Sequence, residues 1–307
     1  MLKKILIFLV LVLLALITKY VIFQKFQNDK HDYDESQAER IFWSLASAAY
    51  SDDPSLCVND NFDIVEFKDQ YTARFGLSST TCSAFSAVSH SDKAIILSFR
   101  YFINGFNAIW DAGMGKDFLA LKNAYPGYEI WVTGHSLGGA LASIAAGIIS
   151  HNDKTYSKMI RLITFGQPRV GDFEYATAMK TLVPNCFRIV NYSDPVAQLP
   201  LKIPIKMFTY YHHATKVWYN ESDGSYKLDT EDNPVEERSW DPYSPHHLNY
   251  FGKSNRFAVE GCSRGRLRNW IKYFKIYLNL VIKPIYWCIP ILTCFFILTT
   301  LYQRFIR

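Results

Sequence analysis

The pattern of apolar and polar positions predicts strands and helices that alternate through the body of the chain. Short apolar runs predict buried strands at 93–99, 129–133, 160–165 and 187–191. Helical periodicity or many small residues predict helices at 35–50, 106–124, 137–150 and 173–182. This alternation is typical of βαβ units, so we expect an α/β fold with a mostly parallel central sheet and helices on both faces. The stretch 195–245 breaks the pattern and is expected to form loops with at most a hairpin.

The N-terminal end is apolar. Residues 1–23 hold an uninterrupted apolar run after two lysines, which predicts a signal peptide or, as the alternative, an uncleaved signal anchor. A polar, charged stretch at 24–37 then forms a linker. The linker leads into one domain at 38–263, in which we find no internal repeats.

The C-terminal end is also apolar. A basic amphipathic flank at 264–284 precedes an uncharged run at 285–302, and residues 303–307 form a tail. The uncharged run is just long enough to cross a bilayer, so we expect a transmembrane segment and a membrane as one partner. The basic flank favours a cytoplasmic body, whereas the N-terminal segment and two glycosylation sequons, at Asn191 and Asn220, favour export. We expect the body to face the secretory lumen or the outside.

Composition and charge narrow the classes of function. The 307 residues, 49% of them hydrophobic, can bury a sizeable core. The net charge is only +5 and no basic stripe with interleaved aromatics crosses the body, so nucleic acid is not an expected partner. The six cysteines lack the spacing of a zinc site or a redox pair, and the sequence suggests no metal or cofactor. It points to no particular protein partner.

The strongest local signal for chemistry is a glycine-flanked serine, Ser136, in the run Gly-His-Ser-Leu-Gly-Gly. The run follows a predicted strand and opens a predicted helix, the setting of the nucleophile elbow in α/β-hydrolases. The glycines remove Cβ atoms that would collide in so sharp a turn. The N–H of Leu137 would then point at a developing oxyanion. An ordinary glycine-rich turn is the alternative, but the strand before and the helix after favour the elbow.

A nucleophilic serine needs a base that is oriented by an acid. Asp194 follows the predicted strand at 187–191, so it is expected at the same edge of the sheet as Ser136. The candidate bases lie further along the chain, as α/β-hydrolases require, and are four histidines: His212, His213, His246 and His247. Spacing alone does not choose among them.

Several motifs in order resemble the class 3 lipase family of fungal-type triacylglycerol lipases, and most of all its secreted nematode branch. These motifs are Ser-Phe-Arg after a strand, VTGHSLGGALA, ITFGQPRVGD, SDPVAQLP, YYHHATKVWY and HHLNYFG. The resemblance covers roughly residues 38–262 and implies an α/β-hydrolase fold with Ser136 as nucleophile, Asp194 as acid and His247 as base. It also implies a disulfide between Cys57 and Cys262.

The chain departs from the family pattern directly after Arg100. In the family, Ser-Phe-Arg continues with an oxyanion loop and then a lid, whereas here a few dozen residues are missing and the backbone N–H of Tyr101 or Phe102 would have to serve. We expect a serine ester hydrolase that acts on lipid or other carboxylic esters through an acyl-enzyme. The alternative is a catalytically impaired, membrane-anchored lipase-like protein that binds lipid or a partner.

Overall fold

The computed structural model describes residues 33–61, 65–74, 81–100, 109–201, 209–230 and 244–254. The chain divides into two units, Met1–Asp34 and Glu35–Arg307. All the helices and strands described below belong to the second unit. The apolar segments at 1–23 and 285–302 lie outside the described residues and stay predictions. Within the described residues, no helix combines the length and the apolar character needed to span a bilayer.

The centre of the second unit is an eight-stranded sheet in which the strands lie side by side in the order of the sequence. Its strands are β1 (Val65–Arg74), β2 (Thr81–Ser89), β3 (Ala94–Arg100), β4 (Glu129–His135), β5 (Ile160–Phe165), β6 (Cys186–Asn191), β7 (Thr215–Tyr219) and β8 (Tyr226–Asp229). The five strands from β3 to β7 are parallel, while β1, β2 and β8 run antiparallel to their neighbours. The expected mostly parallel central sheet is therefore confirmed, with an antiparallel addition at each edge.

The helices connect the parallel strands or precede the sheet. They are α2 (Glu35–Gln37), η1 (Ala38–Phe42), α3 (Trp43–Ala48), α4 (Pro54–Asn61), η2 (Trp110–Met114), α6 (Gly115–Ala124), α7 (Leu137–Asn152), η3 (Lys154–Tyr156), α8 (Phe173–Leu182), η4 (Val196–Gln198) and η7 (Pro245–Leu248). A two-stranded ribbon of β9 (Asn249–Tyr250) and β10 (Lys253–Ser254) follows. Helical geometry at Gln37 and Trp43 joins α2, η1 and α3 into one helix, close to the predicted 35–50.

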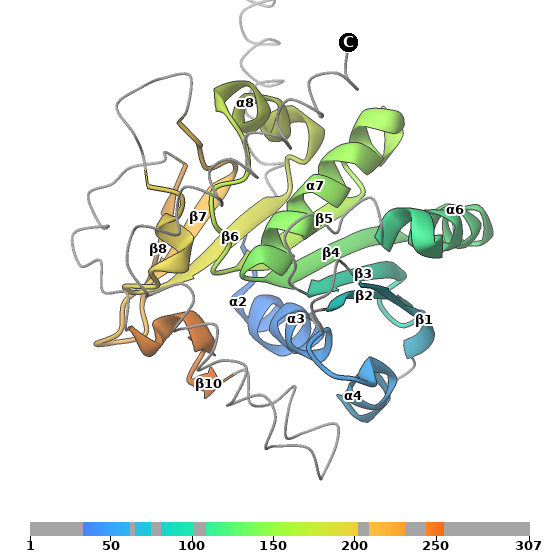
Figure 1. Cartoon of the computed structure of the whole chain (residues 1–307), viewed down its shortest axis with the longest axis horizontal. Coiled ribbons are helices and arrows are strands. Elements are labelled where there is room, and N and C mark those ends of the chain that lie inside the picture. The colour runs from blue at the N-terminus through green and yellow to red at the C-terminus, as the bar shows by residue number, and fades with distance from the viewer. Residues whose placement is uncertain are drawn as a thin grey trace, which may run out of the picture. The chain divides into compact units, whose positions relative to one another are not determined.

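Helices cover both faces of the sheet, as predicted (Figure 1). Successive side chains of a strand point to opposite faces. On β4, Ile130 and Val132 belong to the core cluster that includes residues of α6 and α7. The alternate residues face the first helix: the ring of Trp131 packs on Phe42 at 5.3 Å, and the hydroxyl of Thr133, which donates to Ile163 in the neighbouring strand β5, also lies 3.5 Å from the carbonyl of Phe42.

The sequence pattern missed the hairpin formed by β1 and β2. A bulge between Phe67 and Asp69 breaks the two-residue alternation of β1. Strand β2 is buried, yet it carries several polar side chains. Ser83, Ser86 and Ser89 all lie inside the protein. These strands therefore lack the apolar run or regular alternation by which a strand is recognised. The hairpin of β7 and β8 does fall in the stretch where one was expected.

Candidate active site

Ser136 lies on the sharp turn that joins β4 to α7. Its backbone has φ 60° and ψ −133°, a conformation that costs a residue with a Cβ atom about 1–3 kcal/mol. Its N–H donates to the carbonyl of Phe165 at 2.8 Å. A Cβ atom on Gly134 would overlap the backbone of Gly138, and one on Gly138 would overlap the carbonyl of Phe99. Only glycine fits at these two positions, which is the physical reason for the Gly-x-Ser-x-Gly spacing.

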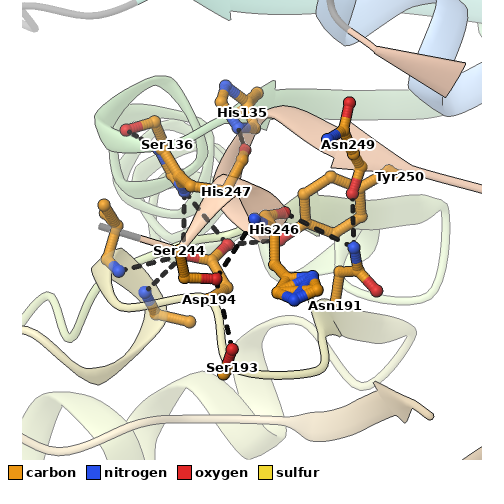
Figure 2. A network of polar contacts seen from close by, with 12 residues as sticks. His135, Ser136, Asn191, Ser193, Asp194, Ser244, His246, His247, Asn249 and Tyr250 are labelled. Atoms are coloured by element: carbon orange, nitrogen blue, oxygen red, sulfur yellow. Dashed lines mark hydrogen bonds and ion pairs between the residues drawn. The ribbon is translucent and has the colours of Figure 1, made fainter. Parts of the chain in front are cut away.

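Three side chains from separate parts of the chain form one hydrogen-bonded series (Figure 2). Nε2 of His247 lies 2.9 Å from Oγ of Ser136. Nδ1 of the same ring lies 2.9 Å and 3.0 Å from the two carboxylate oxygens of Asp194. A carboxylate only accepts, so Nδ1 carries the proton and Nε2 is left to accept the proton of the serine hydroxyl. The structure therefore brings Ser136, Asp194 and His247 together.

The topology of the sheet explains this meeting. Ser136 follows β4 and Asp194 follows β6, and both strands are parallel to the β5 strand between them. The carboxyl ends of parallel strands share one edge of the sheet, where α/β folds bind their ligands. His247 comes from η7, more than fifty residues after Asp194, and reaches the same edge from outside the sheet.

Asp194 is fully buried and is surrounded by hydrogen-bond donors. The N–H groups of Val196 and Ala197 donate to its Oδ1 at 2.9 Å and 3.4 Å. The hydroxyl of Tyr250 donates to its Oδ2 at 2.6 Å. Burial raises the pKa of Asp194, but the charge and hydrogen bond of His247 and the hydrogen bond of Tyr250 outweigh it, so the pKa lies below the ordinary value of 3.8. We therefore expect a carboxylate at neutral pH.

The backbone on both sides of His247 is anchored by one side chain, that of Asn191. Its Nδ2 atom donates to the carbonyl of Asn249 at 2.6 Å and approaches the carbonyl of His246 at 3.5 Å. Asn191 is the last residue of β6, which also leads into Asp194. The same strand therefore positions Asp194 and the segment that carries His247 (Figure 2).

The residue directly before Ser136, His135, also supports His247. Its Nε2 donates to the carbonyl of His247 at 2.6 Å, and its Nδ1 lies 3.0 Å from the hydroxyl of Tyr50. The two imidazole rings lie with centroids 4.5 Å apart. Burial, with the nearby charge of His247, lowers the pKa of His135 to about 3. His135 is therefore neutral at physiological pH and places no second positive charge beside His247.

The other three candidate histidines lie elsewhere. Nε2 of His213 is 3.1 Å from the hydroxyl of Ser143, a second serine–histidine contact, but Ser143 has no exposed surface and an ester could not reach it. His212 donates to the carbonyl of Ala197 at 2.7 Å. His246 packs on the ring of Tyr192, and its Nε2 atom lies 3.5 Å from the carboxylate of Glu221.

The remaining predicted site residues are only partly described. Leu137 is the first residue of α7, so its N–H has no acceptor within the helix and stands next to Ser136. Tyr101 and Phe102 lie outside the described residues, as does Cys262. Cys57 is disulfide-bonded, and its partner is not among the described side chains. Its pairing with Cys262 therefore stays a prediction.

No cluster of histidine, cysteine or carboxylate side chains suited to a metal is found in the described part of the chain.

Sequence reasoning missed the residues that hold the three central side chains in place. They are Tyr250, Asn191 and His135. Tyr250 and His135 lie inside motifs that were singled out, HHLNYFG and VTGHSLGGALA, but the motifs do not state what these two side chains contact. The sequence marks Asn191 only as the end of a predicted strand and as the first residue of a sequon. Gly166 was likewise missed: its φ is +57°, and a Cβ there would lie 2.5 Å from the Asp194 carboxylate.

Comparisons with known proteins agree with this geometry. The family described as lipase (class 3) matches residues 62–203. A lipase of Caenorhabditis elegans is 30% identical over 258 residues, which cover 67% of this chain and 72% of that protein. The aligned length exceeds the covered part of this chain, so the nematode lipase has residues without a counterpart here. A secreted mono- and diacylglycerol lipase of Fusarium solani is 34% identical over 37% of this chain and 33% of its own length.

Solved structures show the same fold. The triacylglyceride lipase of Rhizomucor miehei has a TM-score of 0.58 at 23% sequence identity, and the match covers 74% of this chain and 98% of that one. A lipase of Rhizopus microsporus has a TM-score of 0.56 at 22% identity, with 72% and 89% of the two chains covered. At this level of identity the match concerns the fold alone.

Proposed function

Because this chain belongs to the class 3 lipase family, a family of carboxylic ester hydrolases, we propose that it hydrolyses lipid esters with Ser136 as its nucleophile. The observation that carries the proposal is the position of the His247 ring. One ring nitrogen lies 2.9 Å from the serine hydroxyl and the other 2.9 Å from the carboxylate of Asp194. This is the arrangement by which a base activates a serine.

The reaction proceeds in two halves. Ser136 Oγ attacks the ester carbonyl while Nε2 of His247 takes its proton, and Asp194 stabilises the imidazolium that results. The imidazolium then donates its proton to the leaving alcohol, which departs and leaves an acyl-enzyme. In the second half, His247 activates a water molecule that attacks the acyl carbonyl, releases the carboxylic acid and restores the serine.

The negative charge that develops on the carbonyl oxygen must be stabilised by hydrogen-bond donors. The N–H of Leu137, at the start of α7, is the first donor we assign, and the helix dipole favours an anion there. We assign the second donor to the backbone of Tyr101 or Phe102, directly after β3. Since β3 and β4 are paired in parallel and Phe99 is opposite Gly134, the chain leaves β3 beside the elbow.

The substrate class is proposed from the relatives. Their names describe enzymes that act on mono-, di- and triacylglycerols, so we propose acylglycerols or similar lipid esters as substrates. Secreted relatives also support a body in the secretory lumen or outside the cell. A membrane anchor at residues 285–302 is proposed from the sequence alone.

The decisive experiment compares two serine variants of the full-length chain in detergent micelles, with a chromogenic butyrate ester as substrate. Ser136→Ala is expected to lower kcat/KM by at least about a thousandfold, as loss of a serine nucleophile does. Ser143→Ala is the matched control, because Ser143 also contacts a histidine but is buried, and this variant should keep its activity. Equal activity in all three proteins would refute the assignment of Ser136.

The second candidate function is lipid or partner binding without turnover. It is favoured by the short connection after Arg100, which leaves few residues to form an oxyanion loop. A wild-type protein that is folded and binds lipid vesicles, yet hydrolyses no ester faster than its Ser136→Ala variant, would establish this alternative.

A further inference from the structure

The chain carries two glycosylation sequons, and both asparagines are half-buried, but their side chains contact different parts of the protein. The first is Asn191-Tyr192-Ser193, at the end of β6, and the second is Asn220-Glu221-Ser222, directly after β7. By sequence the two triplets are equivalent. Their contacts in the fold decide which of them a folded protein can carry in modified form.

The side chain of Asn191 bonds to a distant segment of the protein. Its Nδ2 donates to the carbonyl of Asn249 and approaches that of His246, so it faces the segment that holds His247. The serine of this sequon, Ser193, is 5% exposed, and its hydroxyl lies 3.1 Å from the hydroxyl of Ser244. A sugar on Nδ2 would have to occupy the space of η7 and β9. A chain modified at Asn191 therefore could not adopt this fold.

The second sequon lies on the turn between β7 and β8. Within the turn, the N–H of Ser222 donates to the side-chain oxygen of Asn220 at 3.3 Å, and the N–H of Gly224 donates to its carbonyl at 3.1 Å. Asn220 is half-buried, and residues 221–225, which follow it, are exposed to solvent. A sugar attached to Asn220 would project from a surface turn, and the pairing of β7 with β8 would be kept.

We propose that Asn220 is the N-glycosylation site of this protein and that Asn191 stays unmodified. The donor is an oligosaccharide linked through N-acetylglucosamine to a polyprenyl diphosphate. The side-chain nitrogen of Asn220 forms a bond to C1 of the sugar and loses one proton, while the bond from C1 to the phosphate oxygen breaks. The polyprenyl diphosphate leaves with the electron pair of that bond. Because this transfer takes place in the secretory lumen, it fixes the side of the membrane on which the body lies.

The test uses the full-length chain with its own N-terminal segment, expressed in eukaryotic cells. We expect a glycosidase that releases N-linked sugars to increase the electrophoretic mobility of the wild-type protein by one glycan. Asn220→Gln and Ser222→Ala should abolish this change. Ser193→Ala is the matched control, because it removes the other sequon without altering Asn191, and it should keep the full mobility change.

Peptide mass spectrometry supplies the second readout. Release of the sugar converts the modified asparagine to aspartate, and we expect this conversion at Asn220 alone. A wild-type protein whose mobility does not change would overturn the proposal, and so would conversion at Asn191 in folded protein. Ester hydrolysis plays no part in either readout, so the outcome is independent of the proposed function.

Discussion

At the scale of single residues, Asp194 depends on a tyrosine whose hydroxyl bonds to its carboxylate. Asp194 is fully buried, and a buried carboxylate is costly unless donors surround it. The hydroxyl of Tyr250 supplies its shortest hydrogen bond, at 2.6 Å. Tyr250 therefore helps to order His247 indirectly, because it fixes the carboxylate of Asp194 to which His247 is bonded.

Replacing this tyrosine by phenylalanine tests that dependence. Tyr250→Phe keeps the ring and removes one donor from a charged acceptor, an interaction that contributes about 1.5–3 kcal/mol. We expect the pKa of Asp194 to rise and kcat to fall roughly ten- to a hundredfold with KM little changed. The measurement is the steady-state kinetics of ester hydrolysis over a range of pH.

Tyr219→Phe is the matched control for this prediction. The hydroxyl of Tyr219 also donates to a carboxylate, that of Glu35, at 2.9 Å, but the pair lies away from the three central side chains. This control should leave kcat unchanged. If both variants lost activity equally, the effect would be one of general stability and the role given to Tyr250 would be wrong.

At the scale of elements, the site depends on how closely α7 approaches β3 and β4. A Cβ atom on Gly138 would overlap the carbonyl of Phe99 in β3, and backbone atoms cannot move aside cheaply. The elbow and the sheet are therefore one rigid piece, in which the position of Ser136 follows from the packing of α7.

Gly138→Ala should accordingly push α7 away from the sheet. We expect the free energy of unfolding to fall by about 3 kcal/mol or more, because the overlap is with backbone atoms and overpacking a core typically costs about 1–3 kcal/mol. Gly127→Ala is the control, because a Cβ atom there meets nothing within 4 Å. Denaturant unfolding of the two variants beside the wild type measures both effects, and a Gly138→Ala protein as stable as Gly127→Ala would contradict this account.

At the scale of the whole molecule, buried histidines make stability depend on pH. Burial lowers the pKa of His135 to about 3, and burial with the charge of Arg188 lowers that of His213 to about 3, from an ordinary 6.5. Below pH 6.5 these two histidines bind protons in the unfolded chain but stay neutral in the folded protein, so the free energy of unfolding falls as the pH falls. The stability that comes from holding these two histidines neutral is fully present above pH 6.5 and declines down to about pH 3.

We therefore expect the melting temperature to decrease steadily as the pH is lowered from 7 to 4. His213→Gln removes one of the titrating groups, so its melting temperature should depend less steeply on pH than that of the wild type. Thermal unfolding followed by fluorescence over this range checks both statements. A wild-type melting temperature that stayed constant between pH 7 and 5 would show that these imidazoles are not held neutral by the fold.

The local pattern of the sequence determined much of this protein. Apolar periodicity located β3 to β6 and the helices α7 and α8, because burial on a sheet or helix imposes a fixed spacing. The Gly-x-Ser-x-Gly run predicted the elbow at Ser136, since a turn of that sharpness admits few residue types. Both are properties of neighbouring residues and can be read without knowing the fold.

Only the tertiary structure decided which distant residues meet. Spacing left four histidines open, and the motif likeness pointed to His247, which lies against Ser136 because η7 folds back onto the sheet edge. The contacts of Tyr250 with Asp194 and of Asn191 with Asn249 join residues more than fifty positions apart. Periodicity reports which side of an element is buried, but not which element covers it. For that reason the sequence shows Asn191 as part of a sequon, whereas the fold shows that its side chain anchors the segment carrying His247.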